Sequence, residues 1–273
     1  MSDHATASSG GPVSRVVVTR PAREARRWVA QLQERGIDAV ALPLIDIGPV
    51  DDRHPLQEAW RRLGDYAAVM FVSANAVKHF FKEKEAIPSV KWCYPAIKTR
   101  AWATGPGTAQ ALLQAGLART QIDAPGDDAH QFDSEALWAR VCTQVQPGQR
   151  VLMVRGGDAT GQGAGRDWLA DQLAAAGARV ERLIAYRRLP PAFAGDQRAW
   201  AQEAASDGSA WLFSSSEAVG HLAALCPAQD WSRARAVATH PRIAETARRL
   251  GFGVVCESRP TLDAVVSSIK SLE

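Results

Sequence analysis

One pattern occurs twice in this sequence: an apolar stretch, a few small polar residues, and then apolar residues at helical spacing. Residues 67–77 carry it first, and residues 209–219 carry it again 142 positions later, so that Ser73 matches Ser215. The pattern predicts a buried strand and a tight turn that caps a helix. Because His79 and His221 share the same offset, the chain is predicted to contain two related units.

The repeat continues on both sides of this corner. Residues 16–20 are echoed by residues 151–155, and both stretches end in an arginine. Residues 103–106 are echoed by residues 238–241. Strands that alternate with helices in this way predict parallel sheets covered on both faces. We therefore expect an α/β protein with two similar flavodoxin-like or Rossmann-like domains.

Composition and charge narrow the class of protein. The formal net charge is only +3 and no basic stripe is interleaved with aromatic residues, so we expect no nucleic-acid partner. No apolar run is long enough to span a bilayer, and the N-terminal segment lacks the apolar core of a signal peptide. Four widely spaced cysteines and six single histidines suit a cytoplasmic protein without a metal site. Residues 1–13 are expected to form a disordered tail.

A glycine-rich stretch at residues 156–165 follows a predicted strand and precedes a predicted helix, where a phosphate-binding loop would lie. It lacks the Lys and Ser or Thr of a Walker motif, since Arg166 and Asp167 stand in their place. Its last three glycines are two residues apart, which is not the dinucleotide fingerprint. A nucleotide-dependent enzyme is thus one alternative, and a mobile loop that closes on a ligand is the interpretation we favour.

The predicted strands end in Ser, Thr, Gly and Arg, with few acids or nucleophiles. Neither Ser73 nor Ser215 lies in a G-x-S-x-G motif, so a hydrolase nucleophile is not indicated. Both serines could be plain helix caps, and the residues after Thr104 and Thr239 could be plain tight connections. The same corners also offer N–H groups to anions. Since ligands of open α/β sheets bind at the carboxyl ends of strands, a polyanionic small molecule is expected, bound by an enzyme or by a non-enzymatic two-domain protein.

In their order along the chain, these motifs resemble the uroporphyrinogen-III synthase family over residues 14–270. The stretches that carry the resemblance are Val18–Pro21, Pro43–Ile45, Phe71–Val77, Ala103–Ala109, Val154–Gly156, Tyr186 and Phe213–Ser216. The resemblance implies two domains joined by a two-stranded antiparallel β ladder. The implied bounds are residues 14–42 with 190–273 for domain 1, residues 50–180 for domain 2, and residues 43–49 and 181–189 for the ladder. This division fits the repeat only if the N-terminal strand packs beside the second serine corner.

The resemblance also implies an activity. The family cyclises hydroxymethylbilane, a linear tetrapyrrole, to uroporphyrinogen III in haem biosynthesis, with inversion of ring D through a spiro intermediate. It is a lyase that uses no metal or cofactor, and we expect a monomer. A transient contact with the preceding pathway enzyme, the deaminase, would fit, although no residue points to it. The unaided substrate closes without inversion, so the enzyme mainly controls geometry.

The resemblance further implies which residues form the site. Tyr186 would assist departure of the terminal hydroxyl, although it could also be a half-buried strand tyrosine without a role. The acetate and propionate groups of the substrate would be held by Thr19, Arg20, Ser73, Ala74, Asn75, Thr104, Gly105, Thr108, Arg155, Ser214, Ser215 and Thr239. Here the chain has Thr239 and His240 where the family more often has a glycine.

Overall fold

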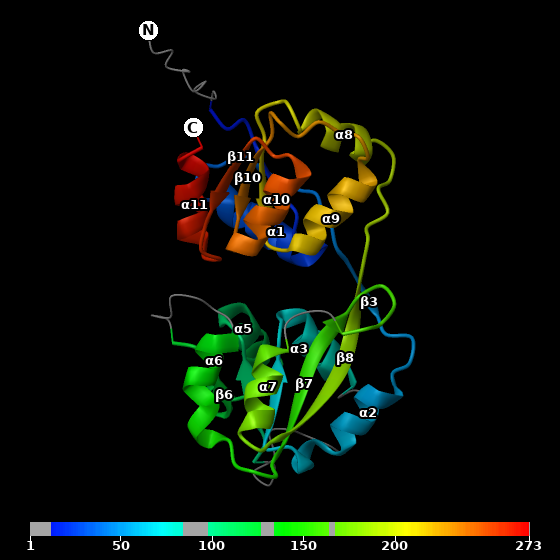
Figure 1. Ribbon diagram of the computed structural model, residues 1–273, viewed down its shortest axis with the longest axis vertical. Coiled ribbons are helices and arrows are strands. Elements are labelled where there is room, and N and C mark those ends of the chain that lie inside the picture. The colour runs from blue at the N-terminus through cyan, green and yellow to red at the C-terminus, as the bar shows by residue number, and fades with distance from the viewer. Residues whose placement is uncertain (1–11, 84–97, 127–133, 164–166, 273) are drawn as a thin grey trace. The chain divides into compact units, whose positions relative to one another are not determined.

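A computed structural model describes residues 12–83, 98–126, 134–163 and 167–272 of the chain (Figure 1). The chain divides into two compact units. Unit 1 combines the segment up to Asp46 with the segment from Pro190 onward, and unit 2 spans Ile47–Leu189. Unit 2 is therefore a continuous stretch that interrupts unit 1 in the sequence.

Unit 1 is built on a five-stranded sheet of order β11-β10-β9-β1-β2, in which all neighbouring strands are parallel. The strands are β1 (Val16–Val18), β2 (Ala39–Ala41), β9 (Ala210–Phe213), β10 (Arg235–Ala238) and β11 (Val254–Glu257). The helices are α1 (Ala22–Gln33), α8 (Gln197–Glu203), α9 (Ser216–Leu225), α10 (Pro241–Leu250) and α11 (Leu262–Lys270).

The N-terminal strand lies in the middle of this sheet. Val17 of β1 is in register with Trp211 of β9 on one side and with Val40 of β2 on the other. Since β9 leads directly into the corner of Ser215, the N-terminal strand does pack beside the second serine corner. The repeat and a discontinuous unit 1 are therefore compatible, because this packing was the condition for both to hold.

Unit 2 is built on a six-stranded sheet of order β3-β8-β7-β4-β5-β6, and the strands from β8 to β6 are parallel to their neighbours. The strands are β3 (Asp46–Pro49), β4 (Ala68–Phe71), β5 (Arg100–Ala103), β6 (Ile122–Asp123), β7 (Arg150–Gly157) and β8 (Arg179–Leu189). The helices are α2 (His54–Arg61), α3 (Ala74–Phe81), α5 (Pro106–Gln114), α6 (Ser134–Val141) and α7 (Trp168–Ala175). The expected α/β fold with parallel sheets is confirmed.

The two sheets have equivalent strand orders, which explains the sequence repeat. The order β2-β1-β9-β10-β11 of unit 1 corresponds to β8-β7-β4-β5-β6 of unit 2. In both sheets the third strand of this series leads into a serine corner, Ser215 after β9 and Ser73 after β4. Each copy of the repeat thus contributes strands to both units.

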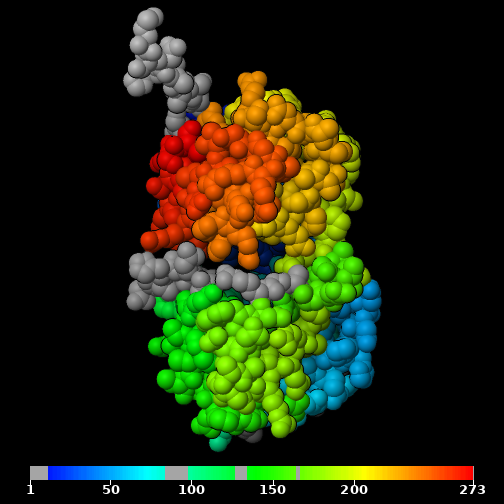
Figure 2. Space-filling model, viewed as in Figure 1, coloured from blue at the N-terminus to red at the C-terminus, as the bar shows by residue number. Residues whose placement is uncertain are grey.

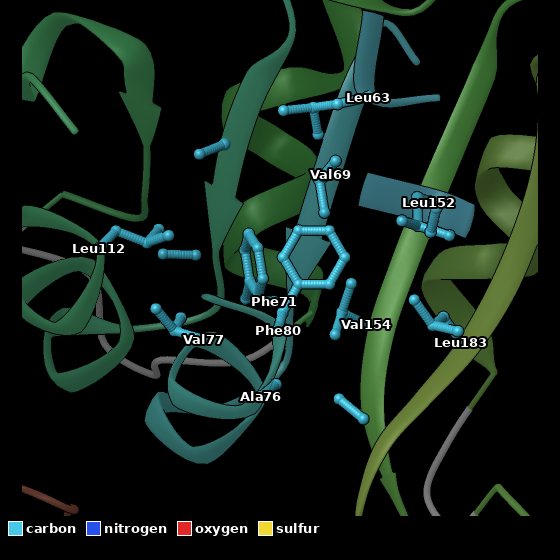
Figure 3. Close-up of a cluster of buried hydrophobic side chains, with 14 of the residues drawn as sticks. Leu63, Val69, Phe71, Ala76, Val77, Phe80, Leu112, Leu152, Val154 and Leu183 are labelled. Carbon is cyan, nitrogen blue, oxygen red and sulfur yellow. The ribbon is translucent and has the colours of Figure 1, made fainter. Parts of the chain in front are cut away.

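Alternate residues of the central strands of unit 2 face different cores, as the two-residue period of a strand requires. Val69 and Phe71 of β4 belong to a cluster with Phe80 of α3 and Leu112 of α5 (Figure 3). Met70 belongs to a second cluster, which includes residues of α6 and α7. A sheet buried on both faces has near-continuous apolar strands, and the run of residues 67–72 is of this kind.

Unit 1 has the same two-faced construction. Val16 and Val18 of β1 pack with residues of α1 and α11. An aromatic group is formed by Trp211 of β9 with Trp231 and Phe252, whose ring centroids lie 5.4 and 6.3 Å from that of Trp211. Figure 2 shows α10 in orange and α11 in red on the face of unit 1 turned to the viewer.

Three boundaries differ from the sequence predictions. Gly156 and Gly157 were expected in a loop, but they are the last residues of β7, because β8 pairs with them. The residues after Thr104 were considered as a tight connection, but α5 already begins at Pro106, since proline is accepted in a first helical turn. The second expected ladder segment is part of the longer strand β8, which pairs with β7 as far as Arg187 and so belongs to the sheet of unit 2.

Some expectations concern residues outside this description. The expected tail lies almost wholly before Pro12, the first described residue, and residues 164 and 165, the end of the glycine-rich stretch, are also outside the described ranges. Within the described ranges, none of the helices is both long and apolar enough to cross a membrane.

Candidate active site

The predicted site residues of unit 2 lie where its parallel strands end. Phe71, near the end of β4, is in register with Ala103 of β5 and with Val154 of β7. Gly156 of β7 is in turn in register with Tyr186 of β8. Because the strands run in the same direction, the residues that follow these positions gather at one edge of the sheet.

Tyr186 is the best-defined side chain of this edge. It is 4% exposed, and its hydroxyl lies 3.0 Å from Oγ of Ser73. Its ring lies 5.6 Å, centroid to centroid, from the ring of His79 on α3. The alternative interpretation was a half-buried strand tyrosine, but Tyr186 is buried and its hydroxyl has a defined partner.

Ser73 has two contacts at this corner. Its Oγ accepts a hydrogen bond of 3.1 Å from the backbone N–H of Ala76, which makes it the N-cap of α3. The interpretation of Ser73 as a helix cap is therefore correct, and its contact with Tyr186 shows that the cap is also part of the strand edge. Ala74 and Asn75 form the first turn of α3, and both are partly exposed.

The corner after β5 contributes smaller groups. The hydroxyl of Thr104 donates a hydrogen bond of 3.3 Å to the carbonyl of Val72, which ties this corner to that of Ser73. Gly105 is the N-cap residue of α5 and has no side chain that could bond to the helix. Thr108 lies in the first turn of α5 and is 6% exposed.

Arg155 is buried beside the same edge, and its guanidinium group already forms an ion pair with a carboxylate. Its Nη1 lies 2.6 Å from Oδ1 of Asp167, and the side chain of Arg155 is only 5% exposed. Asp167 precedes α7, and its other oxygen is 3.6 Å from Arg182 of β8. The hydrogen bond from Arg155 lowers the pKa of Asp167, so the carboxylate is charged at neutral pH.

In unit 1 the corresponding edge carries Thr19 and Arg20, which follow β1. The hydroxyl of Thr19 donates a hydrogen bond of 2.8 Å to the carbonyl of Leu212, so this side chain joins β1 to β9. The guanidinium carbon of Arg20 lies 4.5 Å from the ring centre of Trp28, and Nη1 is 3.7 Å from Glu24. Burial lowers the pKa of Arg20, although an arginine with such neighbours remains charged.

The second serine corner repeats the first in outline. Oγ of Ser215 accepts a hydrogen bond of 3.2 Å from the N–H of Glu217 and so caps α9. Ser214, the preceding residue, is partly exposed. Thr239 is 7% exposed at the end of β10. Nδ1 of His240 accepts a hydrogen bond of 3.1 Å from the N–H of Arg242 and so caps α10. This is the corner at which the resembled family more often has a glycine.

Sequence reasoning missed three residues that define the edge of unit 2. His79 was noticed only as a member of the repeat, although it lies on α3, which Ser73 begins. Asp167 carries no local signal, because its partner Arg155 is reached only when β7 and α7 have packed. Gly156 was assigned to a loop, whereas it lies directly against the ring of Tyr186.

The described part of the glycine-rich stretch is folded on itself. The N–H groups of Thr160 and Gln162 donate to Oδ1 of Asp158, and that of Gly161 donates to the carbonyl of Asp158. The N–H of Asp158 donates to Gln162 in return. A phosphate-binding loop needs such N–H groups for its ligand, so this geometry argues against the nucleotide-dependent alternative.

A comparison with protein families matches residues 26–267 to the model described as uroporphyrinogen-III synthase HemD. The chain belongs to the uroporphyrinogen-III synthase family. The resemblance seen in the short motifs is thus confirmed over most of the chain.

Two relatives within this family were compared in sequence. The uroporphyrinogen-III synthase of Chlorobaculum parvum is 29% identical over 187 residues, which cover 67% of both chains. That of Synechococcus elongatus is 28% identical over 180 residues, which cover 64% of this chain and 61% of the relative.

Solved structures of this family share the fold. A mutant uroporphyrinogen III synthase from Thermus thermophilus matches with a TM-score of 0.56 at 21% identity, over 94% of this chain and 98% of its own. The uroporphyrinogen-III synthetase of Helicobacter pylori matches with the same TM-score at 14% identity, over 95% and 99%.

Proposed function

We propose that this protein cyclises hydroxymethylbilane to uroporphyrinogen III, with inversion of ring D, as a lyase of tetrapyrrole biosynthesis. Membership of the uroporphyrinogen-III synthase family supports the reaction. The observation in this chain that best supports it is the hydroxyl of Tyr186, 3.0 Å from Ser73 at the carboxyl edge of a parallel sheet. A phenol at such an edge can transfer a proton to a bound ligand.

The first step is the loss of the terminal hydroxyl of the substrate. The C–O bond breaks, and the oxygen leaves as water with a proton from Tyr186. An azafulvene cation remains on ring A. Its attack by the substituted carbon of ring D gives the spiro intermediate, which fragments and closes again with ring D inverted. The proton lost in the final step returns to the phenolate, so Tyr186 ends each cycle as it began.

The carboxylates of the substrate are held by many groups of modest strength. Arg20 in unit 1 supplies positive charge, and Arg155 in unit 2 would bind a substrate carboxylate by exchanging Asp167 for it, since arginine is well suited to carboxylates. The N-terminal turns of α3, α5, α9 and α10 supply N–H groups with the favourable sign of the helix dipole. The remaining proposed contacts are those of Thr19, Ser73, Ala74, Asn75, Thr104, Gly105, Thr108, Ser214, Ser215 and Thr239. None of the groups requires a metal or cofactor for this role.

The finer organisation is also a proposal. We propose that β3 and β8, neighbours in the sheet of unit 2, run antiparallel as the ladder between domains of residues 14–42 with 190–273 and residues 50–180. We also propose that the protein is a cytoplasmic monomer and that any contact with the deaminase is transient. A small-molecule substrate requires no permanent partner protein.

The reaction is tested by supplying freshly generated hydroxymethylbilane with and without the protein. The products are oxidised and separated into uroporphyrin isomers I and III. We expect isomer III to dominate only when the protein is present. Isomer I in both samples, with the protein folded, would contradict the proposal and favour a non-enzymatic binding protein.

The role of the tyrosine is tested by Tyr186→Phe, which keeps the ring and removes the hydroxyl. We expect kcat for isomer III to fall at least about tenfold, because proton transfer by a positioned side chain contributes roughly 10²–10⁴-fold. The melting temperature is expected to change little, since one hydrogen bond is worth about 1 kcal/mol. An unchanged kcat would remove Tyr186 from the mechanism.

A further inference from the structure

An irregularity in β8 decides which way Tyr186 points. The strand register runs from Arg155 opposite Ile184 directly to Gly156 opposite Tyr186, so Ala185 is an extra residue in β8. Leu183 and Ala185 face the cluster that includes Phe71 and Phe80. In a regular strand Tyr186 would face the opposite side, but it belongs to the same cluster. The bulge therefore turns the tyrosine toward α3, as bulges beside active sites often do.

The residue opposite Tyr186 must then be a glycine. A Cβ atom built on Gly156 would lie 2.6 Å from Cζ and 2.8 Å from the hydroxyl oxygen of Tyr186. Real Cβ atoms do not approach other atoms so closely, so any side chain at position 156 displaces the ring or the strand. Gly156 has no positive φ, so the space it leaves free, and not its backbone freedom, is what this site requires.

The third constraint acts on the hydroxyl itself. Oγ of Ser73 is fixed by accepting the N–H of Ala76. It therefore lies at a defined place 3.0 Å from the hydroxyl of Tyr186. The ring of Tyr186 lies against the backbone of Gly156 on one side. The centroid of the His79 ring lies 5.6 Å from the centroid of the Tyr186 ring. Ring and hydroxyl are both held.

We infer that Gly156 and Ser73 are positioning residues that hold the phenol of Tyr186 in its reactive orientation, with the bulge at Ala185 setting the direction. The inference rests on the proposed function for its effect on catalysis. Neither residue is asked to touch the reacting atoms in this role. In this role their effect on kcat passes through the hydroxyl of Tyr186, whereas the carboxylate contact proposed for Ser73 would act on KM.

The first test is a double-mutant cycle with Gly156→Ala and Tyr186→Phe. We expect G156A alone to lower kcat at least about tenfold with little change in KM, because a misplaced catalytic group affects the chemical step. Once Y186F has removed the hydroxyl, G156A should cost no further kcat. If the two losses multiply instead, Gly156 acts by another route and the inference is wrong.

Gly157→Ala is the matched control for crowding. A Cβ at Gly157 would lie 2.9 Å from the side chain of Ile184 and 3.1 Å from the carbonyl of Gln162, and none of its three nearest atoms belongs to Tyr186. We expect G157A to lower the melting temperature and to retain kcat. A loss of kcat equal to that of G156A would show a general effect of the end of β7 and would overturn the assignment.

Ser73 is tested by rescue. Ser73→Ala removes both the helix cap and the partner of Tyr186, so both stability and kcat should fall. Ser73→Thr retains a hydroxyl that can do both and should restore both. If S73T restores stability while kcat remains as low as in S73A, the hydroxyl does not position the phenol.

A spectroscopic readout separates this inference from the proposed function. The chain has three tyrosines, so protein containing 3-fluorotyrosine gives a small set of ¹⁹F resonances, and Y186F identifies that of Tyr186. We expect G156A to shift this resonance and G157A to leave it in place. Absence of isomer III with wild-type protein would reject the proposed function alone, whereas an unshifted resonance in G156A would reject the positioning role alone.

Discussion

Acidification should destabilise unit 2 through His79. This side chain is 9% exposed on α3. Burial lowers its pKa from 6.5 to about 4, and the positive charges of Lys82 and Lys78 act in the same direction. Between these two pH values the unfolded chain binds a proton that the folded unit does not. Stability from this group is therefore present above pH 6.5 and is lost as the pH falls toward 4.

The size of this loss follows from the two pKa values of His79. A difference of about 2.5 units corresponds to roughly 3 kcal/mol at most, since one unit is worth 1.36 kcal/mol. Relative to pH 7, linkage gives a loss of about 1 kcal/mol at pH 5.5 and about 2.5 kcal/mol at pH 4.5. Such a loss is a large part of the stability of an ordinary domain.

His79→Gln is the comparison variant, because glutamine does not titrate and is a good helix former. Amide hydrogen exchange in β4, corrected for the intrinsic exchange rate, reports the stability of the unit that contains His79. All other groups titrate in both proteins, so the difference between them isolates this residue. Curves that stay parallel from pH 7 to 4.5 would refute the buried, neutral histidine.

Two further substitutions test other contacts. Phe80→Ala should destabilise unit 2 by about 3–5 kcal/mol in urea unfolding, because Phe80 is fully buried with its ring 4.9 Å from that of Trp60; a cost below about 1 kcal/mol would contradict this packing. Asp167→Asn should cost about 1–2 kcal/mol at neutral pH by weakening a charged hydrogen bond to buried Arg155, less than for a fully buried pair because Asp167 is 46% exposed. Since the pKa of Asp167 is lowered, the two proteins should converge in stability as the pH falls below 3.8, and a constant difference would count against the ion pair.

The features predicted correctly from the sequence are those with local causes. Ser73 and Ser215 were expected as helix caps because small polar residues sit between an apolar run and helical spacing, and both cap their helices. The same local cause acts at α11, where the hydroxyl of Thr261 accepts a hydrogen bond from the N–H of Ala264. Gly251 ends α10 at a φ of 104°, a conformation that favours glycine.

The features that sequence analysis missed depend on contacts between distant residues. Gly156 has the appearance of a loop residue, and it becomes part of a strand only because β8, some thirty residues later, pairs with it. The bulge at Ala185 has no sequence signal, yet it determines that Tyr186 faces Ser73. The pairing of Arg155 with Asp167 likewise appears only when the strand and helix have packed.

The interruption of unit 1 by unit 2 has a consequence for protein synthesis. The ribosome makes β1 and β2 first, then all of unit 2, and only afterwards β9, the partner of β1. Unit 2 can fold as soon as Leu189 has emerged. Throughout that time β1, which is fully buried in the finished sheet, has an open apolar edge of the kind that invites mispairing. Unit 1 is therefore the part of the nascent chain that most needs protection from aggregation.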